Sequence, residues 1–380
     1  MDFLSSKVWI CVVALVPVVG CGDSGSGSGG SGGDGPSIEA PDQLGSLSVG
    51  HTMFTAVDAA RDDRSIVLNV WYPVDAADAT DGPFTQYPLQ AGFNLPSDVA
   101  VDDLPVSSNR TRPFLVFSHG FGGINTQSTQ LMEALASHGF IVASPEHTGN
   151  TALDQSDETP AENRVPDVTF VIDTMFARSN TADDLFEGRI DEALVGVLGH
   201  SFGGGTAMGS VAGWAGAEAD PRVGAIGVIA GRVGEQNFSE EVLGAVTVPV
   251  TFLVGTLDPG ARDNHDYAFP RMTSADAAFK VEVIEANHTH FANVCSIGDL
   301  LIELGSTQEN WPGLGAEALI EPYNATCTDE VFSIDEAHRL QNLYMVAHFK
   351  RYLLGQTEYE AFLTSAYAEA NEPSVTVIEN

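Results

Sequence analysis

Short apolar runs alternate with amphipathic or polar stretches through most of the chain, and this alternation predicts the fold. The first strong strand pattern is SIVLNVWYP, which starts at Ser65, is rich in β-branched and aromatic residues and ends at Pro73. Later apolar runs predict further strands at PFLVFSH, GFIVASP, ALVGVLG, RVGAIGVIA, VPVTFLVG and FKVEVIEA. Helical patterns between these runs favour an α/β fold with a mostly parallel central sheet and helices on both faces.

Helical periodicity is expected near residues 127–137, near residues 167–177 and over residues 335–354, where the last helix should pack on the sheet. Between residues 75 and 112, prolines and glycines are frequent and the apolar positions lack a period. We expect this segment to run over the surface as an irregular excursion. The pattern as a whole predicts one globular domain over residues 45–380.

The first 44 residues differ in composition from the rest. Lys7 precedes VWICVVALVPVV, an apolar run of about twelve residues that is shorter than the roughly 20 needed to cross a bilayer, so residues 1–20 look like a signal peptide. The following VVGC resembles a bacterial lipoprotein signal, which would make Cys21 the lipidated first residue. Ordinary cleavage and an uncleaved membrane stub are the alternatives.

A stretch rich in glycine and serine, GDSGSGSGGSGGDGPS, follows the signal and predicts a flexible linker over residues 21–44. We therefore expect export, either to the bacterial cell envelope through a lipid anchor or as a secreted protein. Cys295 and Cys327 are the two cysteines beyond the signal region. Export permits a disulfide between them, and two free buried thiols are the alternative.

The net charge of the chain argues against some classes of binding partner. The 52 Asp and Glu residues outnumber the 16 Lys and Arg residues, which gives a net charge of −36 at pH 7. Such a surface repels nucleic acid and anionic membranes, so we expect neither as a direct partner. Any membrane contact would come from the N-terminal lipid anchor.

The most informative motif is Gly-His-Ser-Phe-Gly at Gly199–Gly203. The pattern alone is weak, because GGSGG in the linker fits it too. Only the later copy lies between a buried strand and a small-residue helix, FGGGTAMGSVAG, which is the setting of a nucleophile elbow. We predict that Ser201 is a nucleophile, and an ordinary glycine-rich turn is the alternative.

A serine nucleophile needs an acid that orients its base, and both should follow it in the chain. Asp258 comes directly after the strand VPVTFLVG and is the favoured acid, with Asp263 and Asp266 as alternatives. Two amides should stabilise the oxyanion of the reaction, one from Phe202 and one from the SHGFGG segment. Phe121 is the favoured donor in that segment, with Gly122 second.

The base should lie in EANHTHFANVC, directly after the strand FKVEVIEA, which offers His288 and His290. Their His-x-His spacing is also compatible with zinc, although no third ligand cluster accompanies it. The remaining histidines fit less well, since His265 lies close to the acid and is expected to begin a helix, and His338 and His348 fall in the C-terminal amphipathic helix.

Several stretches together resemble the plasma-type platelet-activating-factor acetylhydrolases and their bacterial relatives. They are VWYP (70–73), RPFLVFSHGFGG (112–123), LASHGFIVASPEHTGNT (135–151), GHSFGGGT (199–206) and NHTHF (287–291). The resemblance implies an α/β-hydrolase fold that acts as the catalytic domain, and hydrolysis of short acyl groups from small or lipid-like esters without a metal or cofactor. In that family the base is followed by two residues and a phenylalanine, which maps to His288, and the oxyanion donors map to Phe121 and Phe202.

The chain departs from the animal enzymes in its lipoprotein-like start, its acidic surface and a long C-terminal loop that contains Cys295 and Cys327. A looser similarity links the elbow, acid and base loops to cutinase-like polyester hydrolases and to dienelactone hydrolases, although the latter usually use a cysteine nucleophile. The leading expectation is an exported serine esterase that forms an acyl-enzyme. A polyester hydrolase and a tethered binding protein are the alternatives.

Overall fold

The structure of the chain is a computed structural model that describes residues 38–380 except residues 91 and 329. Glu39–Asn380 forms one compact unit. The predicted signal peptide, Cys21 and all of the predicted linker up to residue 37 lie outside the described residues. Residues 39–44 belong to the compact unit, where Glu39 accepts a hydrogen bond from Lys350 and Asp42 accepts one from Arg339.

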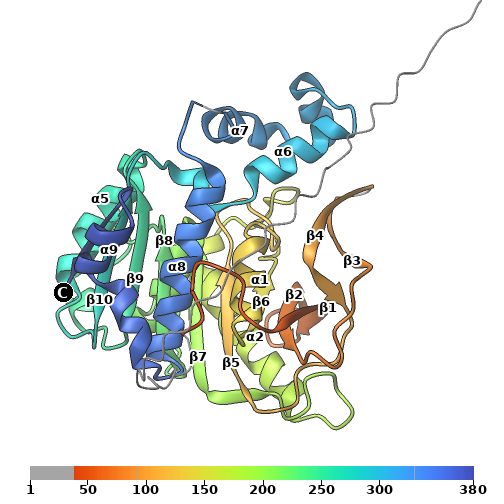
Figure 1. The fold of residues 1–380 in the computed structure, drawn as a ribbon, viewed down its shortest axis with the longest axis horizontal. Helices are drawn as coiled ribbons and strands as arrows, with labels where there is room; N and C mark the ends of the chain where they lie inside the picture. The colour runs from red at the N-terminus through yellow and green to blue at the C-terminus, as the bar shows by residue number, and fades with distance from the viewer. Residues whose placement is uncertain (1–37, 91, 329) are drawn as a thin grey trace, which may run out of the picture. The chain divides into compact units, whose positions relative to one another are not determined.

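Within the described residues, one mixed sheet has the strand order β11-β10-β9-β8-β7-β5-β6-β2-β1-β4-β3 (Figure 1). The strands are β1 (Ser48–Asp58), β2 (Arg64–Val74), β3 (Phe84–Gln90), β4 (Phe93–Asp102), β5 (Arg112–Ser118), β6 (Ile141–Pro145), β7 (Ile190–His200), β8 (Val223–Ile229), β9 (Val250–Gly255), β10 (Ala278–Val283) and β11 (Val375–Glu379).

The centre of the sheet is parallel from β10 to β6. All seven residues of β5 are buried, as expected for a strand covered by helices on both faces. Antiparallel strands flank the centre, β2 against β6 at one side and β11 against β10 at the other. The predicted α/β fold with a mostly parallel core is therefore confirmed.

The expectation of an irregular excursion over residues 75–112 is wrong. Residues 84–90 and 93–102 form β3 and β4, and β4 extends the sheet by pairing in parallel with β1. Pro88 of β3 and Pro96 of β4 interrupt the strand pattern in the sequence. The structure tolerates them because β3 is an edge strand and its pairing with β4 is irregular. The sequence reading also missed β1, whose burial alternates along its second half.

Helices cover both faces of the sheet. Their bounds are α1 (Thr129–Ser137), α2 (Pro160–Ser179), α3 (Phe202–Ala212), α4 (Glu240–Gly244), α5 (Pro259–Ala268), α6 (Val294–Glu303), α7 (Ile320–Thr326), α8 (Ile334–Tyr352) and α9 (Ser365–Asn371), with short 3₁₀ turns η1 (Phe269–Arg271), η2 (His288–Phe291), η3 (Gln308–Leu314), η4 (Glu317–Leu319) and η5 (Thr357–Leu363). Among the described helices, none is long and apolar enough to cross a membrane.

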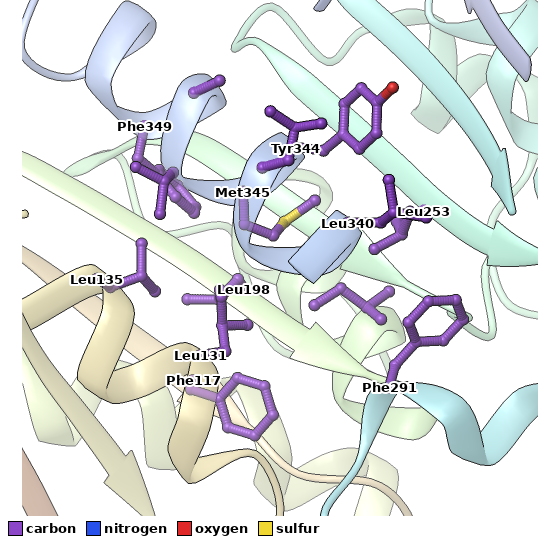
Figure 2. Close-up of a cluster of buried hydrophobic side chains, with 14 of the residues drawn as sticks. Phe117, Leu131, Leu135, Leu198, Leu253, Phe291, Leu340, Tyr344, Met345 and Phe349 are labelled. Carbon is purple, nitrogen blue, oxygen red and sulfur yellow. The ribbon is translucent and has the colours of Figure 1, made fainter. Parts of the chain in front are cut away.

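One apolar core joins α1 and α8 to one face of the sheet, and a second joins α2 and α3 to the other. Figure 2 shows part of the first core, in which Leu340, Tyr344 and Met345 of α8 belong to the same buried cluster as Leu198 of β7 and Leu253 of β9. Burial of such large side chains contributes about 1.5–3 kcal/mol each. The predicted C-terminal helix on the sheet is confirmed as α8.

Two local expectations are wrong. His265 does not begin a helix but lies inside α5, fully buried, where Nε2 accepts a hydrogen bond from the Gly231 N–H. The segment that was expected to be a long loop around Cys295 and Cys327 is largely helical, since it contains α6, η3, η4 and α7. In Figure 1, α6 and α7 lie beyond the sheet, at the top of the view.

Candidate active site

Ser201 lies between β7 and α3, in the sharp turn that the motif predicts. Its backbone has φ 58° and ψ −117°, a conformation that costs a non-glycine residue on the order of 1–3 kcal/mol. The surrounding chain fixes this turn, because the Ser201 N–H donates to Ile229 O and the Ser201 carbonyl accepts from Gly204 and Arg232 N–H groups. The strained turn places the serine side chain at the end of the central strands.

Two glycines make this turn possible because other backbone approaches them closely. A Cβ atom on Gly203 would lie 1.8 Å from the Ser118 carbonyl oxygen, and one on Gly199 would lie 2.3 Å from the Gly203 carbonyl oxygen. Any side chain at either position would therefore push the start of α3 away from β5. The glycines of the motif are explained by this packing.

Asp258 and His288 meet beside the turn. Asp258 is the N-cap of α5, where one carboxylate oxygen accepts the Ala261 N–H at 3.1 Å and the other lies 2.5 Å from His288 Nδ1. Burial raises the pKa of Asp258, but the hydrogen bond and the charge of His288 outweigh it and lower the pKa below its ordinary value. The carboxylate therefore stays ionised and can orient the imidazole.

His290 points to a different set of partners. Its Nε2 lies 2.9 Å from the Phe332 carbonyl oxygen and its Nδ1 lies 2.8 Å from the Asn287 side-chain oxygen. Both His290 ring nitrogens therefore have partners other than Asp258. The sequence left His288 and His290 open as the base, and in the structure His288 is the one whose ring contacts Asp258. Across the described residues, no three His, Cys, Asp or Glu side chains come together in a way that could bind a metal ion.

The predicted oxyanion donors lie on adjacent segments. Phe202 is the first residue of α3, and Phe121 lies in the turn after β5, with the two rings 5.8 Å apart. The first N–H groups of a helix have no partner within it, so the Phe202 amide is free to bind an anion.

A cavity of about 330 Å³ opens at Ser201 and His288. Its walls come from the turn after β5, from β3 and β4, and from the segment that contains α6 and α7. The lining includes Gly120, Phe121, Gly122, Gln127, Leu89, Phe93, Leu153, Ile297, Leu301, Leu314, Leu319 and Pro322. None of the described lining residues is Lys, Arg, Asp or Glu, so the cavity suits an uncharged, largely apolar group.

We call residues 294–326, from α6 to α7, the cap segment. A disulfide joins Cys295 at its start to Cys327 just after its end, so the predicted pairing is confirmed. Gly298 of α6 packs against the ring of Tyr323 in α7, where a Cβ atom would lie 2.1 Å from the ring. The cap segment is therefore a closed helical unit that forms one wall of the cavity.

Sequence reasoning missed two residues that connect the loops of the site. The Gly120 N–H donates to Gln127 Oε1 at 2.9 Å, Gln127 Nε2 donates to His200 Nδ1 at 2.8 Å, and His200 Nε2 donates to the His288 carbonyl at 2.9 Å. Burial, followed by the charge of His288, lowers the pKa of His200 to about 3, so its ring is neutral and has one donor and one acceptor. Gln127 and His200 thus fix the positions of three loops relative to one another.

Comparisons with known proteins identify the family of this chain. The family described as "PETase: PET hydrolase-like" matches residues 103–303, which include the serine, the acid and the histidine. Cutinase 2 of Thermobifida cellulosilytica is 35% identical over 97 residues, or 26% of this chain and 33% of the cutinase. Cutinase est2 of Thermobifida alba is 34% identical over 97 residues and 29% of its length. The match thus spans about a third of these curated relatives.

A solved structure extends the likeness to most of the fold. The ferulic acid esterase from Streptomyces cinnamoneus superposes with a TM-score of 0.61 and 23% identity, and the match covers 87% of this chain and 96% of the esterase. At this identity the likeness shows the fold, which agrees with the mixed sheet and its helices.

Proposed function

This chain belongs to the PET hydrolase-like family, and on that premise we propose that it is a serine carboxylic-ester hydrolase that forms an acyl-enzyme. The observation that carries the proposal is the arrangement at the end of the central strands. Ser201 has the strained backbone of a nucleophile elbow, it shares a cavity with His288, and the His288 ring lies 2.5 Å from the Asp258 carboxylate.

In the proposed mechanism, His288 Nε2 takes the hydroxyl proton of Ser201 while Oγ attacks the ester carbonyl carbon. The Phe121 and Phe202 N–H groups bind the oxyanion, and Asp258 stabilises the imidazolium. Collapse of the tetrahedral intermediate breaks the ester C–O bond, and His288 gives its proton to the leaving alkoxide. Water then attacks the acyl-enzyme by the same steps and releases the carboxylic acid.

We propose that the substrate is a small or lipid-like ester with an apolar acyl group. Support comes from the cavity, which is enclosed on one side by the cap segment and has no charged residue other than histidine among its described lining. A charged headgroup, as in a 2-acetyl phospholipid, would lie outside this cavity. Phospholipid hydrolysis of the platelet-activating-factor acetylhydrolase kind rests only on the sequence resemblance.

Polyester hydrolysis is the second candidate, because the family that matches is described as PET hydrolase-like. A polymer chain needs an open groove on both sides of the scissile bond, preferably with aromatic contacts. Phe93 and Phe121 are the two aromatic residues other than histidine in the described lining, and the cap segment occupies one side. Because the cap segment closes one side of the cavity, we favour the small ester over the polymer as the substrate.

A panel of p-nitrophenyl esters from two to sixteen carbons, assayed beside a 2-acetyl phospholipid and a polyester film, tests both candidates. We expect turnover of short and medium acyl chains, a steep fall for the longest chains, and little release from the film. The Ser201→Ala variant is the control and should lose at least about 10³-fold in kcat. Efficient film hydrolysis by the wild type would favour the polyester candidate.

We also propose export, which the Cys295–Cys327 disulfide supports because such bonds persist in oxidising compartments. Lipidation at Cys21 and the choice between anchored and secreted forms remain predictions from the sequence. We propose no cofactor, no nucleic acid partner, and membrane contact only through the predicted lipid.

A further inference from the structure

We propose that Arg164 is a positioning residue that orients one donor of the oxyanion hole by binding the carbonyl oxygen on the opposite side of the same peptide. This inference rests on the proposed function for its kinetic consequence, but the geometry behind it does not. Arg164 lies near the start of α2, is 1% exposed, and has no part in the predicted triad.

The geometry follows from the planarity of the peptide bond. The Phe121 N–H and the Gly120 C=O belong to one rigid trans peptide and therefore point in opposite directions. Arg164 NH2 donates to the Gly120 carbonyl oxygen at 3.0 Å, and His119 Nδ1 donates to the same oxygen at 2.8 Å. With its carbonyl bound on the buried side, the peptide must direct the Phe121 N–H away from Arg164, toward the cavity that Phe121 lines.

The preceding peptide is bound in the same way. Arg164 NH1 donates to the His119 carbonyl oxygen at 2.6 Å, while the Gly120 N–H at the other side of that peptide donates to Gln127 Oε1. One planar guanidinium thus contacts two successive carbonyls, a geometry that a lysine ammonium cannot reproduce. The Arg164 guanidinium also lies 5.0 Å from the ring centre of Phe202, the residue that carries the second proposed donor.

Charged and polar groups behind Arg164 fix its position. Asn150 accepts a hydrogen bond from NH2, and Ser118 Oγ accepts one from NH1 at 3.2 Å. The Ser118 hydroxyl in turn donates to His147 Nε2 at 2.9 Å, and His147 Nδ1 donates to the Asp167 carboxylate at 2.9 Å. This buried chain resembles a catalytic triad in its residue types, but it is fully enclosed and serves to anchor the loop.

The charge states agree with these directions. Burial, then the charge of Arg164, lowers the pKa of His147 to about 4, so the ring is neutral and accepts at Nε2. Burial lowers the pKa of Arg164 to about 9, which still leaves it protonated at pH 7. A cation on the carbonyl end polarises the peptide and strengthens its N–H as a donor to an anion.

The test compares Arg164→Gln and Arg164→Lys with Arg178→Gln, a matched control. Arg178 lies on the same helix, is ion-paired with Asp184 and lies over the rings of Phe54 and Phe186. In p-nitrophenyl ester hydrolysis, we expect Arg164→Gln to lower kcat by about 10–100-fold with KM changed less than about threefold, and Arg164→Lys to lose less. Arg178→Gln should keep the wild-type kcat.

A second readout does not depend on activity. In protein labelled with ¹⁵N-phenylalanine, we expect the Phe121 amide signal, assigned with Phe121→Leu, to move in Arg164→Gln and to stay in place in Arg178→Gln. A folded Arg164→Gln protein with a wild-type Phe121 signal and wild-type kcat would overturn the positioning role. If the wild type itself hydrolyses no ester, the proposed function fails, and the amide signal alone then decides whether Arg164 orients this peptide.

Discussion

At the scale of single residues, His288 is positioned through both its side chain and its backbone. Asp258 binds the ring at Nδ1, and His200 donates a hydrogen bond to the carbonyl. The ring is partly exposed at the cavity, while Asp258 behind it is mostly buried. This combination leaves Nε2 available to a substrate and gives the imidazolium a nearby counter-charge.

The two neighbouring histidines provide a matched pair of variants. We predict that His288→Gln lowers kcat for p-nitrophenyl butyrate by about 10³–10⁴-fold, because the serine loses its base. His290→Gln should keep kcat within a few-fold and lose about 1 kcal/mol of unfolding free energy, because its ring is bonded to Phe332 and Asn287. Equal losses of kcat in the two variants would contradict the assignment of His288.

The sequence pointed to Ser201, Asp258 and His288 because each follows a readable strand, and their roles remain predictions that the geometry supports. Gln127 and Arg164 could not be found in this way. Their partners are mainly backbone groups of Gly120 and its neighbour, and a bond to backbone leaves no residue pattern in the chain. The assignment of Phe121 as a donor remains a prediction from its place after β5 and from the family resemblance.

At the level of helices and strands, the cap segment is an addition to the central sheet and the helices that cover it. It is closed by one disulfide, it contains α6 and α7, and it lines the cavity through residues such as Leu301 and Leu319. The sequence identified its cysteines but not its helices, because the short turns η3 and η4 and prolines interrupt any helical period. Strands β3 and β4, at one end of the sheet, were missed for a related reason, the prolines within them.

Removing the disulfide should loosen this wall of the cavity. On the chain-entropy model, a loop closed over a separation of 32 residues contributes about 3–4 kcal/mol, so we predict that Cys295→Ser with Cys327→Ser lowers the free energy of unfolding by roughly that amount. Urea unfolding measures the change. A loss below about 1 kcal/mol would show that the cap segment is ordered by packing alone.

Filling the cavity from the cap segment should change acyl preference. Leu319 lines the cavity, whereas Leu304, at the end of α6, is 58% exposed and is absent from the described lining. We predict that Leu319→Trp lowers the ratio of kcat/KM for octanoate to that for acetate by about tenfold, because the longer chain meets the added ring. Leu304→Trp is the control and should leave the ratio unchanged. An unchanged ratio in Leu319→Trp would place the acyl chain elsewhere.

At the scale of the whole molecule, a very acidic chain encloses a set of neutral histidines. Burial lowers the pKa of His200, His265 and His348 to about 3 and of His147 and His338 to about 4. Each of these groups binds protons more readily in the unfolded chain. Their contribution to stability is therefore complete above the unfolded value of about 6.5 and declines as the pH falls below it.

His348 offers the cleanest test of this acid sensitivity, because it is fully buried in the core between α8 and β9 and far along the chain from the site residues. From pH 7 to pH 5, one such group should cost on the order of 2 kcal/mol of unfolding free energy. We predict that, between pH 7 and pH 5, His348→Gln loses less unfolding free energy than the wild type by about this amount. Urea unfolding at the two pH values measures the difference. Identical losses would contradict the buried neutral histidine.

The overall architecture was the most predictable part of the molecule. The central strands are continuous apolar runs with helices between them, and this alternation predicts their parallel arrangement, whereas their order in the sheet comes from the structure. The flanking strands β1 and β11 are short or half-exposed and have weaker patterns. From the acidic composition we expect no polyanion-binding surface. The composition carries no information on the substrate, which depends on how three separate segments meet at one cavity.

Covalent labelling tests most directly whether Ser201 is an activated nucleophile. After treatment with diisopropyl fluorophosphate, intact-mass spectrometry should show one phosphoryl adduct, peptide mapping should place it on Ser201, and Ser201→Ala should show none. A folded wild-type protein that gains no adduct, or an adduct that persists in Ser201→Ala, would show that Ser201 is not the nucleophile.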